Sequence, residues 1–312
     1  MDYAKISVII VTYRQADVIG RNLDSILNQK EYGLYEIVIC DDCSPDNNWE
    51  VIQSYAKRYP NIIRAYRNEQ NMGIYGNSIK AASLHGDADL FCWLEGDDAL
   101  CDGFFKAAQD FIHKHKINLL EPIGIFSDYY AIDLNNKKRL KKNDFVLRKE
   151  KPYSSYLRNM ASWRASLFTK QVISTFHPVE LNKGLMLAET LFDAQWFRYI
   201  KNAYYNDVAG SIYYTGIGVS AKWGLSNSIS KYKVEENIIR WQYLLDNGML
   251  CEKEDIFWAY SQIAYSSCLQ KLRVKQWLRF NKYYIKGLKH YKMSFLKLLL
   301  KNLHLFVLVM KK

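Results

Sequence analysis

The chain has 312 residues, 49% of them hydrophobic. This length and composition support a substantial hydrophobic core and exclude a protein too small or too polar to form one. The formal net charge of +11 is unevenly distributed, because residues 271–312 hold twelve Lys or Arg and no Asp or Glu. This is a near-neutral body with a cationic C-terminal region, which indicates an anionic surface as partner for that region only. No recognition module accompanies the basic run, so nucleic acid is not expected as a partner.

The cellular compartment of the protein can be predicted from its cysteines and its N-terminal residues. The six cysteines form no paired C-x-x-C zinc pattern, and the single C-x-x-C, Cys40 to Cys43, lies across a predicted strand end. No signal peptide precedes the first predicted strand, so we expect a cytoplasmic protein with reduced thiols.

The first hundred residues alternate between predicted strands and helices. Apolar runs predict strands, and apolar residues at helical spacing predict the helices between them. The predicted strands are 6–11, 36–40, 62–66 and 88–94, and the predicted helices are 17–28, 48–58 and 76–84. Short connections between such units imply an α/β fold with a mostly parallel, doubly wound sheet.

Beyond residue 100 the pattern is less regular. We expect a helix over 102–115, a strand over 124–133, a helix over 185–203 and a strand over 207–214. From Lys231 onward the chain reads as helical, with bends near Gly248 and Gly287. The basic run 137–142 is either a solvated hairpin arm or a site for a diphosphate or an anionic acceptor.

Acidic residues cluster directly after the fourth predicted strand. Glu95, Asp97 and Asp98 lie within four positions, and their mutual repulsion is costly unless a hard divalent cation offsets it. Two other strands also end in polar residues, Thr12-Tyr13 and Asp41-Asp42. Polar groups at successive strand ends predict a ligand crevice at the carboxyl edge of a parallel sheet.

These motifs together resemble glycosyltransferase family 2. The resemblance is specific over about residues 5–100, looser from 120 to 220 and absent in the tail. It implies an inverting GT-A fold, a nucleotide-diphospho-sugar donor, and Mn²⁺ or Mg²⁺. The matching stretches are 8–13, 40–46, 71–73 with Asn77, and 94–98.

The resemblance assigns donor-binding roles along the first two strands and the third helix. Thr12 and Tyr13 would place a ring against the nucleobase, and Asp41 would accept the imide N–H of uracil, supported by Asp42. Capping of the next helix is the alternative for Asp42. The other donor-site candidates in this region are Asn71, Gly73 and Asn77. Gly73 would allow the backbone to approach the donor closely, or it simply forms a turn.

The resemblance makes the acidic cluster a variant of the family's D-x-D motif. Glu95 replaces the usual first Asp, Gly96 separates the acids, and Asp97 is expected to contact the metal directly. Asp98 is the second metal-site candidate. The metal would stabilise charge that develops on the leaving nucleoside diphosphate.

An inverting transfer also needs a general base. The resemblance places it near the start of a helix, where Glu189 and Asp193 lie four residues apart, and Glu189 is favoured over Asp193. Ser220 lies in a loop that resembles the family's loop over the diphosphate; a plain flexible loop is the alternative.

The expected organisation is a GT-A domain over 1–225 and a basic helical region over 226–312. The domain would consist of a nucleotide-sugar half, 1–100, and an acceptor half, 101–225. Residues 295–310 are too short and too interrupted by charge to span a bilayer, so we expect peripheral contact with anionic membrane at its inner face, or packing on the body or in a homodimer.

The expected function is sugar transfer from a nucleotide-diphospho-sugar, with UDP as the favoured nucleotide, to a glycan or lipid-linked glycan acceptor in lipopolysaccharide, O-antigen or capsule synthesis. The alternative is a degenerate nucleotide-sugar-binding subunit without transferase activity, because Glu95 and the Glu189-Thr190 pair depart from the family pattern.

Overall fold

A computed structural model describes most of the chain. The described residues are 2–147, 153–154, 157, 164, 166–174, 194–216, 227–250, 252–271, 273–290, 298–303 and 305. They fall into two compact units, an N-terminal α/β unit and a C-terminal helical unit.

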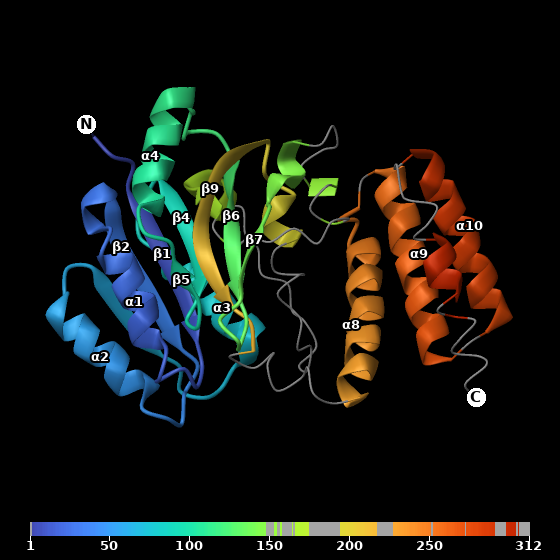
Figure 1. Ribbon diagram of the computed structural model, residues 1–312, viewed down its shortest axis with the longest axis horizontal. Coiled ribbons are helices and arrows are strands. Elements are labelled where there is room, and N and C mark those ends of the chain that lie inside the picture. Colours follow the sequence, from blue (N-terminus) through green and yellow to red (C-terminus); the bar gives the residue numbers. More distant parts are fainter. Residues whose placement is uncertain are drawn as a thin grey trace. The chain divides into compact units, whose positions relative to one another are not determined.

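The N-terminal unit starts with four parallel strands in the order β3-β2-β1-β4. Because apolar residues fill both faces of β1, β2 and β4, these strands are almost completely buried, as expected for a sheet covered by helices on both sides. Their bounds are β1 Ile6–Thr12, β2 Leu34–Asp41, β3 Ile63–Arg67 and β4 Leu90–Glu95, which confirms all four predicted strands (Figure 1).

Helices connect these strands at the predicted positions. They are α1 Ile19–Leu27, α2 Asn48–Arg58 and α3 Gly73–Ser83, with a short 3-10 turn, η1, over Lys30–Tyr32. The buried side of α1 contributes Leu23, Ile26 and Leu27 to the main hydrophobic core. These packed layers hold the carboxyl ends of β1, β2 and β4 in fixed positions.

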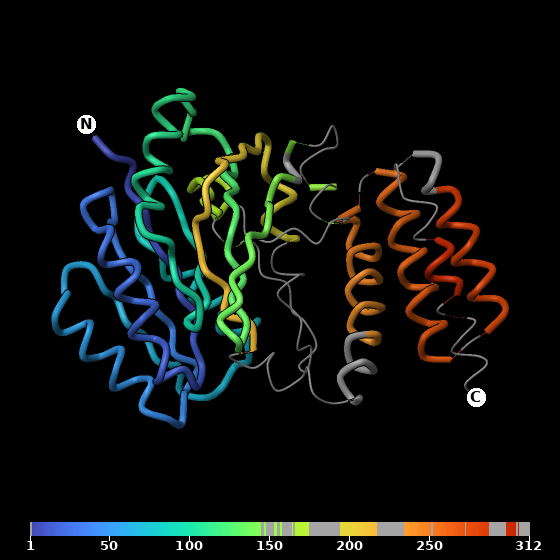
Figure 2. The backbone as a smooth tube through the Cα atoms, viewed as in Figure 1, coloured from blue at the N-terminus to red at the C-terminus, as the bar shows by residue number. Residues whose placement is uncertain are grey.

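The sheet continues beyond β4 with mixed strand directions. The order is β4-β8-β6-β9-β5, in which β6 and β9 are parallel while β8 and β5 run antiparallel to their neighbours. Figure 2 traces the backbone through this half of the sheet. The strands are β5 Ala99–Leu100, β6 Ile123–Ile132, β7 Lys138–Lys141, β8 Ser166–Thr169 and β9 Asn202–Tyr214.

Further helical segments of this unit include one longer helix, α4 Phe104–His115, and two short ones, α6 Lys170–Ile173 and the 3-10 turn η2 Asp144–Leu147. The α/β class with a sheet dominated by parallel strands is as predicted.

One predicted boundary is wrong. A helix was expected through residue 203, but β9 begins at Asn202 and pairs in parallel with β6 from Ile123. The segment 202–206 therefore extends the predicted strand, because backbone pairing with β6 outweighs the local helical spacing. Two strands, β5 and β8, were not predicted at all, because segments of two and four residues carry no usable periodicity.

The C-terminal unit is helical. Its helices are α8 Asn227–Asp246, α9 Lys253–Gln270 and α10 Val274–His290. The break after α8 contains Gly248 with a positive φ of 60°, as predicted. α10 continues through Gly287 and ends at His290, and residues 291–297 lie outside the described part of the chain, so the bend expected near Gly287 stays a prediction; a further break separates α9 from α10. None of the helices in the described residues has the length and apolarity needed to cross a bilayer.

Candidate active site

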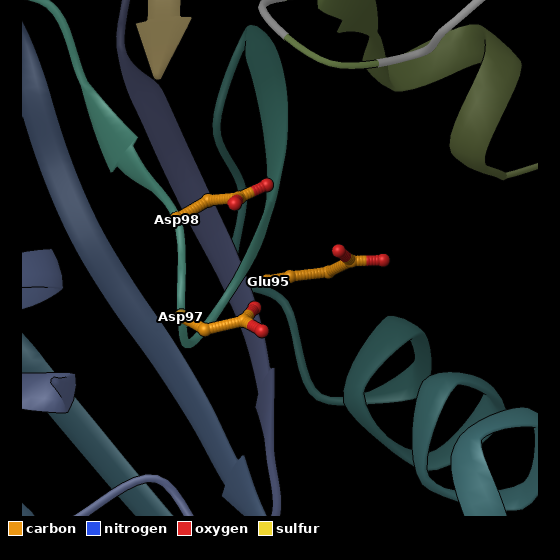
Figure 3. Close-up of side chains that lie close together, drawn as sticks. All are labelled: Glu95, Asp97 and Asp98. Atoms are coloured by element: carbon orange, nitrogen blue, oxygen red, sulfur yellow. The ribbon is translucent and has the colours of Figure 1, made fainter. Parts of the chain in front are cut away.

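Three carboxylates gather at the end of β4. Glu95 ends the strand, and Asp97 and Asp98 follow in the turn before β5, with one carboxylate oxygen of each within 4.8 Å of the others. Figure 3 shows the three side chains projecting to the same side of this turn. Asp98 is fully buried and Asp97 is 8% exposed.

The backbone of the turn is held in place from two sides. A Cβ on Gly96 would lie 2.8 Å from the Cβ of Thr12, so a larger residue does not fit at this position. From α1, the Asn22 amide donates hydrogen bonds to the carbonyls of Glu95 (2.8 Å) and Asp98 (3.0 Å). The carboxylates are therefore presented by a rigid turn.

Arg164 bridges two of the three carboxylates. Its guanidinium lies 2.9 Å from a Glu95 carboxylate oxygen and 3.2 Å from one of Asp98, and it stacks 4.1 Å from the ring centroid of Tyr213. Asp98 also accepts a hydrogen bond from the backbone N–H of Tyr214 at 3.3 Å. Within the described residues, Asp97 is the member of the cluster that forms no ion pair.

Burial and the charges of neighbouring carboxylates raise the pKa values of Asp97 and Asp98. Burial, and then the Glu95 charge, raises the pKa of Asp97 from 3.8 to about 6. Burial also raises the pKa of Asp98 well above its ordinary value, although Arg164 opposes this rise. The pKa of Asp97 stays raised although Arg164 and Arg21 both lower it, and the hard oxygen donors of the three acids fit the preference of Mg²⁺ or Mn²⁺.

At the end of β2, Asp41 is fully buried in a network of protein donors. One carboxylate oxygen accepts from the Asn48 amide at 2.7 Å, and the other accepts from the Ser44 backbone N–H at 3.0 Å and lies 3.4 Å from Arg67 Nε. Asn48 also donates to the hydroxyl of Thr12 at 3.1 Å. Thr12 and Asp41 are register partners, so this network joins the ends of β1 and β2.

The Asp42 side chain is bonded at the start of α3 and does not cap α2, the helix that follows β2. One carboxylate oxygen accepts from the Asn68 amide at 2.7 Å and from the Met72 backbone N–H at 2.8 Å. Asn77 is also buried here, since it accepts from Asn68 at 2.9 Å and donates to the Cys40 carbonyl at 3.0 Å. Asp42 and Asn77 therefore brace β2 against α3, and donor binding by either stays a prediction.

The other donor-site candidates are more accessible. Tyr13 is half-buried, with the Arg14 guanidinium 5.2 Å from its ring centroid. Asn71 donates to the Asp42 carbonyl at 3.3 Å and accepts from the Gly73 backbone N–H at 3.1 Å. Gly73 has a φ of 73° at the start of α3, which explains the glycine there without a ligand.

The basic run 137–142 forms one arm of a hairpin. β7 is exposed along its whole length and pairs with the end of β6. Lys142 is bound within the protein, 2.8 Å from carboxylate oxygens of both Asp128 and Asp207, and Lys138 lies over the ring of Tyr130 at 3.7 Å. The hairpin is as expected in one of the two interpretations, and anion binding by its exposed lysines stays a prediction.

The predicted base and loop residues cannot be placed beside this site. Glu189, Asp193 and Ser220 lie outside the described residues. Their assigned roles remain predictions from the resemblance.

Sequence reasoning missed several residues that shape the site. Arg164 lies far from the acidic motif in the chain and carries no local signal, while Asn48 was predicted only as the first residue of a helix and was given no role in the site. Arg21 donates to the Asp97 carbonyl at 2.8 Å and stacks on Tyr214 at 3.6 Å. One indication of such residues was present in the sequence: three acids in one turn require positive charge nearby.

Curated relatives match the N-terminal part of this chain. The putative glycosyltransferase EpsE of Bacillus subtilis is 28% identical over 112 residues, which cover 36% of this chain and 40% of that protein. Abequosyltransferase RfbV of Salmonella typhimurium is 34% identical over 110 residues, covering 34% of this chain and 32% of that protein. The chain therefore spans less than half the length of these relatives.

Solved structures and a family profile extend the comparison. The crystal structure of S. aureus TarS 1-349 in complex with UDP-GlcNAc shares the fold, with a TM-score of 0.55 and 16% identity, over 92% of this chain and 91% of that one. The sequence profile described as Glycosyl transferase family 2 matches residues 7–168, just over half of the chain, and this region includes the acidic turn and the polar ends of β1 and β2. The chain belongs to glycosyl transferase family 2.

Proposed function

We propose that the chain is an inverting, metal-dependent glycosyltransferase that uses a nucleotide-diphospho-sugar, with UDP as the nucleotide. The observation that carries this proposal is the position of acidic residues at the carboxyl ends of β2 and β4, the two strands that flank β1 in a family 2 fold: Asp41 ends β2, and Glu95 and Asp97 lie together at the end of β4. The fold shared with TarS, which was solved with UDP and with UDP-GlcNAc, supports the choice of nucleotide.

In this proposal the ends of β1 and β2 hold the nucleotide. Tyr13 stacks on the base, and the Thr12–Asp41 pair supports that edge through the Asn48 hydrogen bonds. Asn71 and Gly73 line the approach from α3, with Asp42 and Asn77 bracing them.

Asp97 would hold the cation, with Asp98 and Glu95 kept in position by Arg164. A divalent cation at this position would supply positive charge to balance the negative charge that develops on the leaving nucleoside diphosphate. Gly96 allows the turn to approach Thr12 closely, which brings the acid cluster next to the end of β1.

The transfer itself is a single displacement. A carboxylate, Glu189 in preference to Asp193, takes the proton of the acceptor hydroxyl while the hydroxyl oxygen attacks the anomeric carbon. The bond from that carbon to the diphosphate breaks at the same time, so an α-linked donor yields a β-linked product. Ser220 would hydrogen-bond the diphosphate from the following loop.

The acceptor is a glycan or a lipid-linked glycan of a bacterial surface polysaccharide, such as lipopolysaccharide, O-antigen or capsule, extended at the inner face of the membrane. The name of RfbV, an abequosyltransferase, supports sugar transfer within this family. The exposed lysines of β7 lie on a strand pair that reaches Tyr214 and the acid cluster, which suits an acceptor that carries negative charge.

Thermal-shift titration tests the donor site. UDP, GDP, CMP and dTDP are each added with and without Mn²⁺ to the wild type, to Asp97→Ala and to the control Asp102→Ala, whose side chain is exposed. We expect metal-dependent stabilisation by UDP in the wild type and the control, and none in Asp97→Ala. Stabilisation by no nucleotide would contradict the proposed donor site, whereas stabilisation by a nucleotide without any sugar transfer would favour the degenerate-subunit alternative.

Donor hydrolysis and transfer assays then test the base. Glu189→Gln is expected to retain UDP binding and lose transfer, whereas Asp193→Asn retains both. The opposite pattern would assign the base to Asp193, and full transfer activity in both variants would contradict a carboxylate base at this helix.

A further inference from the structure

Helix α10 has two apolar faces, of which its own unit covers one. On the covered face, Phe280 and Tyr284 are buried in a cluster with Ala264 and Cys268 of α9 (Figure 1 shows the two helices side by side). A helix packed in this way is normally polar on its remaining surface. The second apolar face of α10 therefore requires an explanation.

The second face is a stripe of exposed aliphatic side chains. Val274, Leu278 and Ile285 are 72%, 55% and 49% exposed, and their spacing of four and seven residues places them on one side of the helix. A run of large apolar side chains left exposed on one surface indicates an interaction site rather than scattered surface residues.

Basic side chains border this stripe. Lys275, Arg279, Lys282 and Lys286 are all exposed, and their spacing of four, three and four residues forms a second row beside the first. Residues 271–312 contain no acidic residue, so nothing on this part of the chain neutralises the row.

A neighbouring segment adds to the same kind of surface. The Asn302 side-chain oxygen accepts from Trp277 Nε1 at 2.8 Å and from the Asn281 amide at 3.1 Å, which joins residues 298–303 to α10. Leu299, Leu300 and Leu303 of that segment are exposed as well. We call the stripe, the basic row and these leucines the α10 surface.

We infer that the α10 surface binds the headgroup region of an anionic membrane. Aliphatic side chains beside a continuous row of lysine and arginine match the two components of such an interface, apolar acyl chains below negatively charged headgroups. A second copy of the chain is a poorer partner, because two α10 surfaces would bring their basic rows together. Nucleic acid would pair with the basic row and leave the aliphatic stripe unexplained.

Vesicle co-sedimentation tests the inference with the full-length chain. Binding is compared on vesicles of phosphatidylglycerol and of phosphatidylcholine. One double variant, Leu278→Gln with Ile285→Gln, removes apolar area, and a second, Lys275→Gln with Arg279→Gln, removes charge. The matched controls are Leu120→Gln and Lys57→Gln with Lys114→Gln, all exposed sites in the N-terminal unit.

We expect binding to phosphatidylglycerol that weakens with salt, and little binding to phosphatidylcholine. Each lost cation should weaken binding about fivefold, so the charge variant loses on the order of 25-fold. The apolar variant should lose on the order of tenfold or more. Both controls should bind like the wild type, and circular dichroism checks that every variant is folded.

Three results would overturn the inference. The wild type could fail to bind phosphatidylglycerol, or the α10 variants could bind like the controls. Sedimentation velocity could also reveal a dimer that Leu278→Gln with Ile285→Gln disrupts, in a protein that ignores vesicles, which would assign the surface to a second copy. None of these readouts requires sugar transfer, so they are independent of the proposed function.

Discussion

Replacing Asp97 with asparagine removes a negative charge whose burial beside other carboxylates destabilises the folded state. The pKa of Asp97 rises from 3.8 to about 6 on folding, mainly because the side chain is buried and then because Glu95 is close. A difference of about two units corresponds to roughly 3 kcal/mol of unfavourable free energy in the ionised folded state. Asp97 forms no ion pair within the described residues, so asparagine should lose little in return.

The effect has a defined pH dependence. Because the folded state binds the proton more tightly than the unfolded state, the stability contributed by this group falls as the pH rises from about 4 to about 6. The destabilisation is complete above that window and absent below it. Asp97→Asn should therefore raise the free energy of unfolding by up to about 3 kcal/mol near pH 8 and by less than about 1 kcal/mol near pH 4.

Urea unfolding in the presence of a chelator measures both values. The exposed residue Asp102 provides a matched control, and Asp102→Asn should leave stability unchanged at both pH values. In addition, Mn²⁺ should stabilise the wild type and not Asp97→Asn. A variant that is no more stable than the wild type near pH 8, or whose gain is independent of pH, would refute the electrostatic account of the acidic turn.

Three further substitutions test the surroundings of the site. Arg164→Gln should lower the free energy of unfolding by about 3 kcal/mol in chelator, because it leaves the buried Asp98 and the partly buried Glu95 without their counter-ion, and Mn²⁺ should restore more stability to it than it adds to the wild type in thermal melts. Gly96→Ala should cost about 1–3 kcal/mol in urea unfolding, since its Cβ would meet Thr12; an unchanged midpoint would show that the turn can shift. Asp41→Asn should cost about 1–3 kcal/mol, because its new amide NH₂ donor would face the Asn48 amide or the Ser44 backbone N–H, which are themselves donors; equal stability would mean that the buried network rearranges freely.

Much of the N-terminal fold could be predicted from the sequence. The four parallel strands are apolar runs that end in polar residues, and α2 occupies 48–58 as expected because Asn48 follows a turn-rich segment and precedes a regular apolar spacing. These signals are local, so no knowledge of distant partners is needed.

Other elements depend on partners that are distant in sequence. β5 and β8 exist because β9, β4 and β6 offer backbone groups to pair with, and the start of β9 at Asn202 follows from its register with β6. Likewise, α10 passes through Gly287 because packing on α9 supports the helix across a residue that weakens it locally.

The acidic turn shows the same division within the site. The sequence by itself determined that Glu95, Asp97 and Asp98 would follow a buried strand and would need a compensating cation. Only the tertiary structure decided that Arg164 approaches Glu95 and Asp98 and leaves Asp97 without an ion pair in the described chain. The reason is physical: spacing rules relate residues within one helix or strand, whereas a contact between a turn and a side chain 66 residues away depends on how the whole sheet closes.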